Sequence, residues 1–224
     1  MNKSLSAKQV LSISRNHITP GGIWADCVGE MDRHGVVFFW GNSGNGKTSA
    51  VMSFCRELCT FGSVLYISME EGYSLSMQNT LRRFSMQDLG TKFQVIDHYN
   101  REELDERLSR QRSPEFIVFD SFQYTQMRYA DYLKLKEKYR NKLLIFVSHA
   151  EGKQPAGRAA KSVKYDASLK IWVEGHVAFS LGRFIGTTGK AVIWADGCRR
   201  YWGTDDVAFI YSEKKDSNNN QTEK

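Results

Sequence analysis

Apolar stretches of strand length alternate with longer amphipathic stretches from residue 35 to residue 148. The apolar stretches are Gly35–Trp40, Ser63–Ser68, Phe93–Ile96, Glu115–Asp120 and Leu143–Ser148. Between them the pattern predicts helices over Thr48–Thr60, Leu75–Phe84, Glu102–Arg112 and Tyr129–Arg140. Strands that alternate with helices form βαβ units, and continuously apolar strands are typical of a parallel sheet covered on both faces. The pattern therefore predicts an α/β fold with a mostly parallel central sheet flanked by helices.

The pattern changes on both sides of this region. Before it, Lys8–Ser14 is predicted as a short helix with Ser6 as its N-cap, and Pro20-Gly21-Gly22 ends that helical stretch. After His149, glycine turns separate shorter strands, which are predicted at Lys170–Val173, Val177–Leu181, Lys190–Trp194 and Arg200–Trp202. We expect these strands to form an antiparallel C-terminal extension of the sheet. The last residues, 212–224, are polar and predict a disordered tail.

Composition and charge narrow the class of protein. A chain of 224 residues with 41% hydrophobic residues suits a single globular domain. No apolar run is long enough to span a bilayer, and Met1–Arg15 lacks the apolar centre of a signal peptide, so we expect a cytoplasmic protein. The cysteines lack zinc-ligand spacing and are expected to be buried free thiols. The net charge of +6 fits either a polyanionic partner or a solvated basic surface.

A phosphate-binding motif lies between the first strand and the first helix of the alternating region. Residues 41–48 match the pattern G-x-x-x-x-G-K-[ST] in full: Gly41, Asn42, Ser43, Gly44, Asn45, Gly46, Lys47 and Thr48. Glycines let backbone N–H groups wrap around phosphate oxygens, and the following helix adds the positive end of its dipole. We expect Lys47 to reach the β- and γ-phosphates and the Thr48 hydroxyl to bind Mg²⁺. The motif therefore predicts a site for ATP with magnesium.

A carboxylate ends another of the predicted strands. Asp120 follows the apolar residues Phe116–Phe119, and the carboxyl ends of parallel strands meet at the ligand edge of such a sheet. At that edge Asp120 is expected to hold Mg²⁺ through water, as the second acidic residue of phosphate-loop enzymes does. The alternative is that Asp120 caps the helix that follows it.

Three segments around these sites resemble RecA, the RadA repair ATPases and DnaB-type helicases. Ser63–Gly72 (SVLYISMEEG) is similar to the strand that ends in a glutamate in those families. Phe116–Gln123 (FIVFDSFQ) resembles the aspartate strand of RadA with its Asp-Ser-x-Gln ending. Leu144–His149 (LIFVSH) resembles the next strand, which in RadA and DnaB relatives ends in a polar γ-phosphate sensor.

Two later segments continue the resemblance in the same order. Ser162–Gly175 (SVKYDASLKIWVEG) resembles the RecA-family segment after the flexible loop. Gly182–Gly203 resembles the DnaB ending, in which an arginine and a glycine turn precede two strands. The resemblance runs from about Gly35 to Gly203. It includes neither the zinc module of RadA nor the collar domain of a replicative helicase, so we expect a stand-alone RecA-like core of a phage or mobile-element type.

This resemblance implies the residues of an ATP-hydrolysing site. It places the general base that activates water at Glu70, with Glu71 as the rival position. It places a γ-phosphate sensor at His149. The alternatives are that both glutamates are carboxylates at the start of a helix and that His149 only satisfies a strand end.

The resemblance also implies that the sites form between subunits of a ring or filament. Arg183 matches the arginine that a neighbouring subunit contributes to the γ-phosphate. DnaB relatives often carry a lysine two residues before that arginine, where this chain has Leu181. Lys190 is then the candidate for a second cation. The alternative is that Arg183 makes a surface contact beside the glycine turn.

A basic stretch follows the sensor strand. Residues 151–164 carry Lys153, Arg158, Lys161 and Lys164, and in RecA-like proteins the corresponding loop contacts DNA. Flexible loops with spaced cations suit phosphate contacts, whereas the absence of aromatic residues from this stretch argues against base readout. The basic helix over residues 129–142 is a weaker candidate, because such helices are usually solvated. We therefore expect DNA, in single-stranded form, as a partner.

Together these inferences define domains and competing functions. We expect residues 1–34 to form an N-terminal helix and linker packed on the core, residues 35–211 a RecA-like ATPase domain, and residues 212–224 the tail. The leading hypothesis is a DNA-dependent ATPase in recombination, repair or replication. The second is an ATP-dependent oligomeric regulatory module without a DNA role, like the clock ATPase KaiC. A small-molecule phosphotransferase is the third, although such enzymes usually close an arginine-rich lid over ATP.

Overall fold

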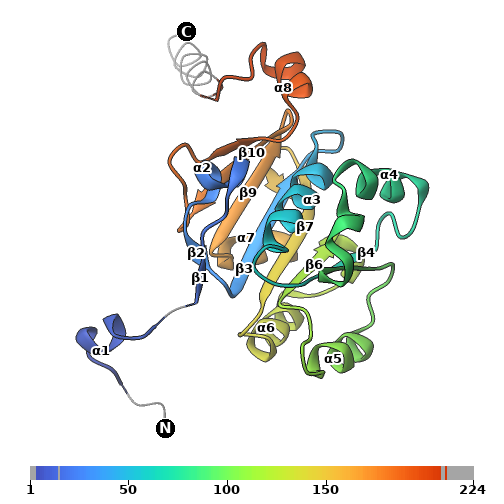
Figure 1. Ribbon diagram of the computed structural model, residues 1–224. Coiled ribbons are helices and arrows are strands. Elements are labelled where there is room, and N and C mark those ends of the chain that lie inside the picture. The colour runs from blue at the N-terminus through green and yellow to red at the C-terminus, as the bar shows by residue number, and fades with distance from the viewer. Residues whose placement is uncertain (1–3, 15, 208–209, 211–224) are drawn as a thin grey trace.

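A nine-stranded sheet forms the centre of the computed structural model, which describes residues 4–14, 16–207 and 210 (Figure 1). Its strands follow the order β11-β10-β9-β3-β7-β6-β4-β5, and β8 pairs with β7 outside this path. The strands span β3 Gly35–Gly41, β4 Val64–Ser68, β5 Phe93–Ile96, β6 Phe116–Asp120, β7 Leu143–Glu151, β8 Gln154–Pro155, β9 Leu169–Glu174, β10 Val177–Gly182 and β11 Lys190–Val192. The six strands from β9 to β5 are parallel, which confirms the α/β fold class.

Helices cover both faces of the sheet, and each face has its own apolar core. Successive strand residues point to opposite faces, so Val37 and Phe39 of β3 join one core and Val36 and Phe38 the other. The first core is closed by α2 (Ala25–Val28), α3 (Lys47–Leu58) and α4 (Leu75–Arg83). The second is closed by α5 (Arg101–Ser109), α6 (Tyr129–Lys138) and α7 (Arg158–Asp166). Burial on both faces explains why the strands read as continuous apolar runs.

Short 3₁₀ segments connect several of these elements. They are η1 Gly22–Trp24, η2 Met86–Lys92 and η3 Phe122–Thr125. The last of these, η3, follows β6 and carries Gln123. The side-chain amide of Gln123 donates to the Ser148 hydroxyl of β7 and to the carbonyl of Ala156.

The antiparallel extension begins one strand later than the pattern predicts. β9 joins the sheet parallel to β3, so the antiparallel extension consists of β10, which pairs with β9, and β11, which pairs with β10. The predicted strand Arg200–Trp202 is wrong, because those residues lie in the helix α8 (Ala195–Trp202). Helix formation buries Cys198 beside β10, and it places Arg199 and Arg200 near the negative end of the helix dipole.

The N-terminal region has two parts. Residues 17–32 include a small two-stranded antiparallel sheet of β1 (His17–Ile18) and β2 (Met31–Asp32), which the pattern does not predict. The buried side chains of Ile18 and Trp24 join the core on the α3 side. The helix α1 (Ala7–Leu11) is N-capped by Ser6 as predicted, but it has no buried residue and lies apart from the body (Figure 1).

The predicted tail, residues 212–224, lies outside the described residues. In the part of the chain that the structure describes, no helix has the length and apolar character that a membrane span needs.

Candidate active site

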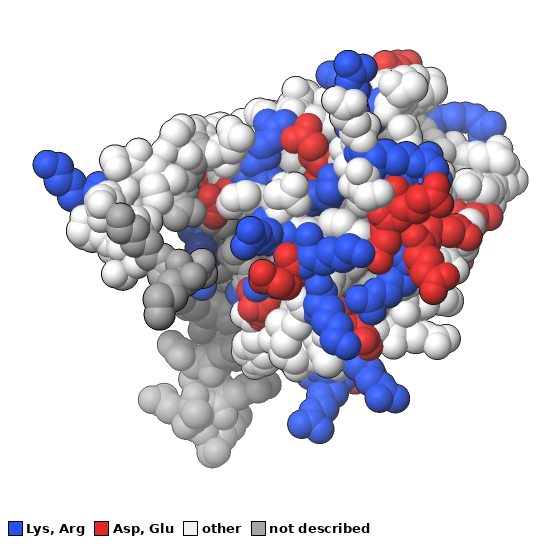
Figure 2. All heavy atoms as spheres, turned by 90° about the horizontal axis from the view of Figure 1, so that it is seen from below, with Lys and Arg blue, Asp and Glu red and all other residues white. Residues whose placement is uncertain are grey.

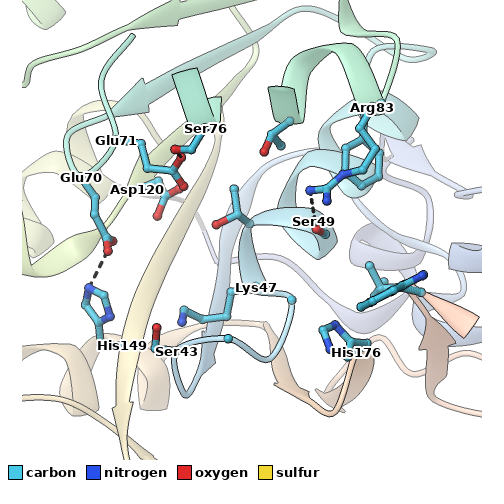
Figure 3. Close-up of a pocket in the computed structure, with 17 residues that line it drawn as sticks. Ser43, Lys47, Ser49, Glu70, Glu71, Ser76, Arg83, Asp120, His149 and His176 are labelled. Carbon is cyan, nitrogen blue, oxygen red and sulfur yellow. Dashed lines mark hydrogen bonds and ion pairs between the residues drawn. The ribbon is translucent and has the colours of Figure 1, made fainter. Parts of the chain in front are cut away.

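A cavity of about 810 Å³ opens at the carboxyl edge of the parallel strands. Its lining comes from the phosphate-binding motif, from the ends of β4, β6 and β7, from α4, and from the segments after β9 and β11. Figure 3 shows Lys47 in the middle, with Glu70 and His149 to one side and Arg83 and His176 to the other. The size is that of a site for a small molecule.

The backbone of residues 41–48 requires glycine at particular positions. A Cβ at Gly41 would come within 2.2 Å of the carbonyl oxygen of Val173. Gly46 has a φ of +89° and is the N-cap of α3, and a Cβ there would meet the His176 ring at 2.9 Å. Because Gly46 has no side chain that could cap α3, the first N–H groups of the helix are available to an anion. Helix N-termini bind phosphate in this way.

Asn45 fixes this motif to the turn between β9 and β10. Its side-chain oxygen accepts a 2.8 Å hydrogen bond from the N–H of Gly175, and its carbonyl accepts one from the N–H of His176 at 3.1 Å. The Asn45 amide also donates to the carbonyl of Ser43 at 3.1 Å. Asn45 thus anchors the phosphate-binding loop to the β9–β10 turn.

Lys47 extends along the floor of the cavity. Its Nζ donates a 3.2 Å hydrogen bond to the carbonyl of Asn42. Burial lowers the pKa of Lys47, and the carboxylates of Glu70 and Asp120 oppose that shift. A partly desolvated ammonium that faces carboxylates across a cavity is suited to pairing with a phosphate. Thr48, the next residue, also lines the cavity.

Asp120 lies buried at the end of β6, one strand from Ser68 of β4. Its carboxylate accepts a hydrogen bond from the hydroxyl of Tyr66, a partner that the sequence did not reveal. Burial raises the pKa of Asp120 from 3.8 to about 6; the Tyr66 hydrogen bond opposes the shift, Glu70 and Glu71 add to it, and Lys47 opposes it.

These residues fit a magnesium ion that is bound mainly by phosphate and water. Within the described residues, no group of three His, Cys, Asp or Glu side chains could hold a metal by itself. Mg²⁺ usually keeps several waters and uses one or two carboxylates together with substrate phosphates. Among the described residues the buried hydroxyl of Ser68 has no hydrogen-bond partner, and it lies in register with Asp120, so it is available to a water bound to the ion.

The two candidate bases face different neighbours. A carboxylate oxygen of Glu70 lies 3.2 Å from Nε2 of His149, and both side chains are about a third exposed at 38% and 34%. Glu71 instead accepts a hydrogen bond from the hydroxyl of Ser76 near the start of α4 (Figure 3). Glu70 is therefore oriented toward the end of β7, and Glu71 toward α4.

Gln123 connects His149 to the basic segment. Its side-chain oxygen lies 3.4 Å from the N–H of His149, and its amide donates to the Ser148 hydroxyl at 2.8 Å and to the carbonyl of Ala156 at 3.0 Å. Ala156 lies just before α7. The Asp-Ser-x-Gln ending contained this residue, but its role depends on contacts between distant parts of the chain.

The basic segment is ordered and partly helical instead of being a flexible loop. β8 pairs with the end of β7, and α7 begins at Arg158. Lys153 and Arg158 are exposed and Lys161 is half-buried. Lys164 is less available to contact a ligand than these three residues. Its Nζ lies 4.4 Å from the centroid of the Trp40 ring and donates a hydrogen bond to Gln154.

Tyr165 adds an aromatic side chain to this surface. It is 76% exposed and shares one face of α7 with Arg158 and Lys161, because residues 158, 161 and 165 recur at helical spacing. The sequence pattern does not reveal its role, because glycine and proline in residues 151–164 predict a loop that ends one residue before Tyr165. Recognition of Ala160, Val163 and Ala167 as an apolar helical stripe would have revealed it.

Arg183 is exposed and lies far from the cavity of its own chain. β10 starts at Val177 beside the phosphate-binding edge and runs away from it, and Gly182 pairs with Leu169 at the opposite edge. Six strand residues correspond to roughly 20 Å. Lys190, the candidate second cation, donates to the carbonyl of Val207 at 2.6 Å.

The architecture is similar to that of FlaH, a flagellar accessory protein from Methanocaldococcus jannaschii. The TM-score is 0.55 with 13% sequence identity, over 75% of this chain and 88% of that chain. The fold is therefore RecA-like. The sequence matches no known family and no curated protein.

Proposed function

We propose that this protein is a magnesium-dependent RecA-like ATPase whose turnover is coupled to single-stranded DNA. The observation that carries the proposal is the convergence of Lys47, Thr48, Asp120, Glu70 and His149 on one cavity. A phosphate cradle, a site for the metal and a base for water are the groups that phosphoanhydride hydrolysis requires.

Each residue of the cavity has a role in this proposal. The loop and Lys47 bind the β- and γ-phosphates, while Thr48 and, through water, Asp120 would hold Mg²⁺. When bound, the ion neutralises the charge that develops on the phosphate oxygens. Glu70 accepts a proton from the attacking water, a step that typically contributes 10²–10⁴-fold. His149 orients Glu70 and senses the γ-phosphate.

The DNA part of the proposal rests on the surface formed by the β7–β8 hairpin and α7. Lys153, Arg158 and Lys161 supply cations for phosphates, and Tyr165 supplies a ring on which a base can stack. Gln123 bonds both to Ala156, just before α7, and to His149. In this proposal, DNA bound on α7 acts through Gln123 on His149 and so on Glu70. Recombination, repair and replication are the processes that use such coupling.

A second candidate is a regulatory ATPase module whose client is a protein. Lys164 is held against Trp40, which leaves fewer cations for a polyanion. Figure 2 shows acidic and basic side chains mixed over the face that includes α5 and α6, so the charge of +6 is not gathered there. Salt bridges Lys136–Asp166 and Lys138–Asp105 pair two cations of α6. One solved structure with a similar fold is named as a flagellar accessory protein.

Self-association into a ring or filament completes the site in this proposal. Arg183 cannot reach the cavity of its own chain from the opposite edge of the sheet, but it is exposed and can contact a neighbouring subunit.

A cytoplasmic location is part of the proposal. The four cysteines are free and buried, which suits a reducing compartment.

The test is the rate of ATP hydrolysis with and without single-stranded DNA at two salt concentrations. We expect magnesium-dependent turnover that DNA stimulates less at the higher salt. Turnover that ignores DNA at both salts would favour the protein client. Lys47→Ala is the control that assigns the activity to this cavity. The substitution should abolish hydrolysis by this protein, whereas hydrolysis by a contaminating ATPase would persist.

A further inference from the structure

The cavity extends beyond the part that phosphate chemistry explains. Glu70 and His149 lie at one end, and Ser43, Gly44 and residues 46–49 form the middle (Figure 3). With the γ-phosphate at Glu70, as the proposed hydrolysis requires, the part of the cavity beyond Ser49 is left for the nucleoside. The walls in that direction are Thr80, Arg83, Phe84, Ile193 and Trp194. Neither the motif nor the proposed hydrolysis gives these side chains a role.

Trp194 forms one wall of this end and is held in place by its neighbours. Its ring meets that of His176 edge-on at 4.9 Å, and the guanidinium carbon of Arg200 lies 5.4 Å from its centroid. A Cβ at Gly197 would come within 2.3 Å of the indole, so α8 also packs closely against it. The side chain nevertheless remains 45% exposed. An indole that is positioned but not buried is suited to contact a ligand.

Arg83 forms the other wall, next to the phosphate-binding motif. Its guanidinium donates a 2.9 Å hydrogen bond to the hydroxyl of Ser49 and lies 5.3 Å from the centroid of the Phe84 ring. The guanidinium is therefore fixed beside Ser49, between the phosphate-binding motif and the far end of the cavity. Guanidinium and indole groups are both planar surfaces that stack on nucleobases.

The polar groups at this end discriminate poorly between purines. Among the described residues that line the cavity, the carboxylates are Glu70, Glu71 and Asp120, and all three lie on the side opposite Arg83 and His176 (Figure 3). Guanine presents N–H donors that a carboxylate would accept, whereas Arg83 offers only donors. The Thr80 hydroxyl and the His176 ring can each donate or accept, and so can serve either base. A site without groups that complement one base rejects the other only weakly.

We propose that Trp194 and Arg83 form a nucleobase subsite that selects purines by stacking and barely distinguishes adenine from guanine. This inference rests on the proposed nucleotide-binding function and adds the class of its substrate, purine nucleoside triphosphates. Stacking area accounts for the preference over pyrimidines, since a purine covers more of the indole.

The experiment compares magnesium complexes of ATP, GTP, CTP and inorganic tripolyphosphate by isothermal titration calorimetry. We expect ATP and GTP to bind within about tenfold of each other and more tightly than CTP. In Trp194→Ala, ATP and GTP should weaken about tenfold, the scale of one stacked base, while tripolyphosphate binds as before. Tyr201→Ala is the matched control, since Tyr201 is an exposed aromatic residue of α8 that does not line the cavity.

The outcomes separate this subsite from the phosphate site. Unchanged ATP affinity in Trp194→Ala, with tripolyphosphate still bound, would overturn the subsite and leave the proposed function in place. Loss of tripolyphosphate binding in both Trp194→Ala and Trp194→Phe would assign Trp194 to support of the loop instead. GTP binding more than a hundredfold weaker than ATP would overturn the weak discrimination. If the unmodified protein binds neither ATP nor tripolyphosphate, both proposals fail.

Discussion

Nε2 of His149 lies 3.2 Å from a carboxylate oxygen of Glu70, and the two residues come from strands that are not neighbours. Glu70 follows β4 and His149 belongs to β7, with β6 and its terminal Asp120 between them. The Glu70–His149 pair therefore spans the carboxyl end of β6, where Asp120, the residue proposed to hold magnesium, lies. This arrangement gives Glu70 a fixed direction that Glu71, bound to Ser76, does not share.

That difference predicts unequal effects of two isosteric substitutions. Glu70→Gln should retain ATP binding and slow hydrolysis by about 10²-fold or more, the usual scale for loss of a general base. Glu71→Gln should have a much smaller effect. Single-turnover hydrolysis at saturating ATP measures both, and the reverse ranking would assign the base to Glu71.

Asp120 predicts an unusual dependence of stability on pH. The pKa of this buried carboxyl is raised to about 6, so the folded protein holds a proton that the unfolded chain releases between about pH 4 and pH 6. The contribution of this group to stability is therefore present at low pH and lost as the pH rises through 6. At pH 7.5 the charged carboxylate costs up to about 3 kcal/mol in the ligand-free protein.

Asp120→Asn should consequently stabilise the ligand-free protein at pH 7.5 while abolishing magnesium-dependent hydrolysis. The gain should shrink as the pH falls from 6 toward 4, which urea unfolding at several pH values would measure. Asp166→Asn is the control with the opposite sign. Burial opposes the shift, but hydrogen bonds from Lys136 and Tyr132 lower the pKa of Asp166, so its loss should destabilise at pH 7.5. Equal destabilisation by both variants would contradict the assignment for Asp120.

Some of this site could be predicted from the sequence, because its chemistry is contiguous. Residues 41–48 carry the phosphate cradle within one motif, and the apolar pattern places that motif between a strand and a helix. The Tyr66–Asp120 hydrogen bond could not be predicted, since it depends on the register that pairs Ser68 with Asp120. Likewise, glycine and proline before α7 suggested a loop, whereas packing of Ala160 and Val163 on the sheet stabilises a helix.

Three cations on the hairpin and α7 predict how DNA binding depends on salt. Neutralising Lys153, Arg158 and Lys161 together should weaken binding and reduce the log–log salt slope by roughly 0.7 for each lost phosphate contact. Fluorescence anisotropy with labelled single-stranded DNA would measure the slope. The control neutralises Lys134, Lys138 and Arg140, which changes the charge equally near α6. A slope that changes only in the control would move the site to α6.

Tyr165 predicts a change of another kind. Tyr165→Ala should weaken binding of single-stranded DNA by a similar factor at every salt concentration, because stacking involves no counterion release. The salt slope should stay constant in the same anisotropy experiment. Tyr129→Ala, an exposed tyrosine at the start of α6, is the comparison. If Tyr165→Ala binds DNA as the unmodified protein does, the ring does not contact bases.

The position of Arg183 predicts that an active site is shared between two subunits. Arg183 lies at the edge of the sheet opposite the cavity, so any contact with a γ-phosphate must be made in a neighbour. A guanidinium suits that role because it is always charged and presents several donors to phosphate oxygens, and such arginines contribute roughly 10³–10⁵ in rate. Arg183→Ala and Lys47→Ala should therefore each be inactive alone. Mixed together, they should regain activity, because one interface then pairs an intact cradle with an intact arginine. Hydrolysis measured across mixing ratios, with mixed oligomers verified by differently tagged subunits, tests this directly. If mixed oligomers form and no ratio restores hydrolysis, Arg183 does not act on a neighbouring site.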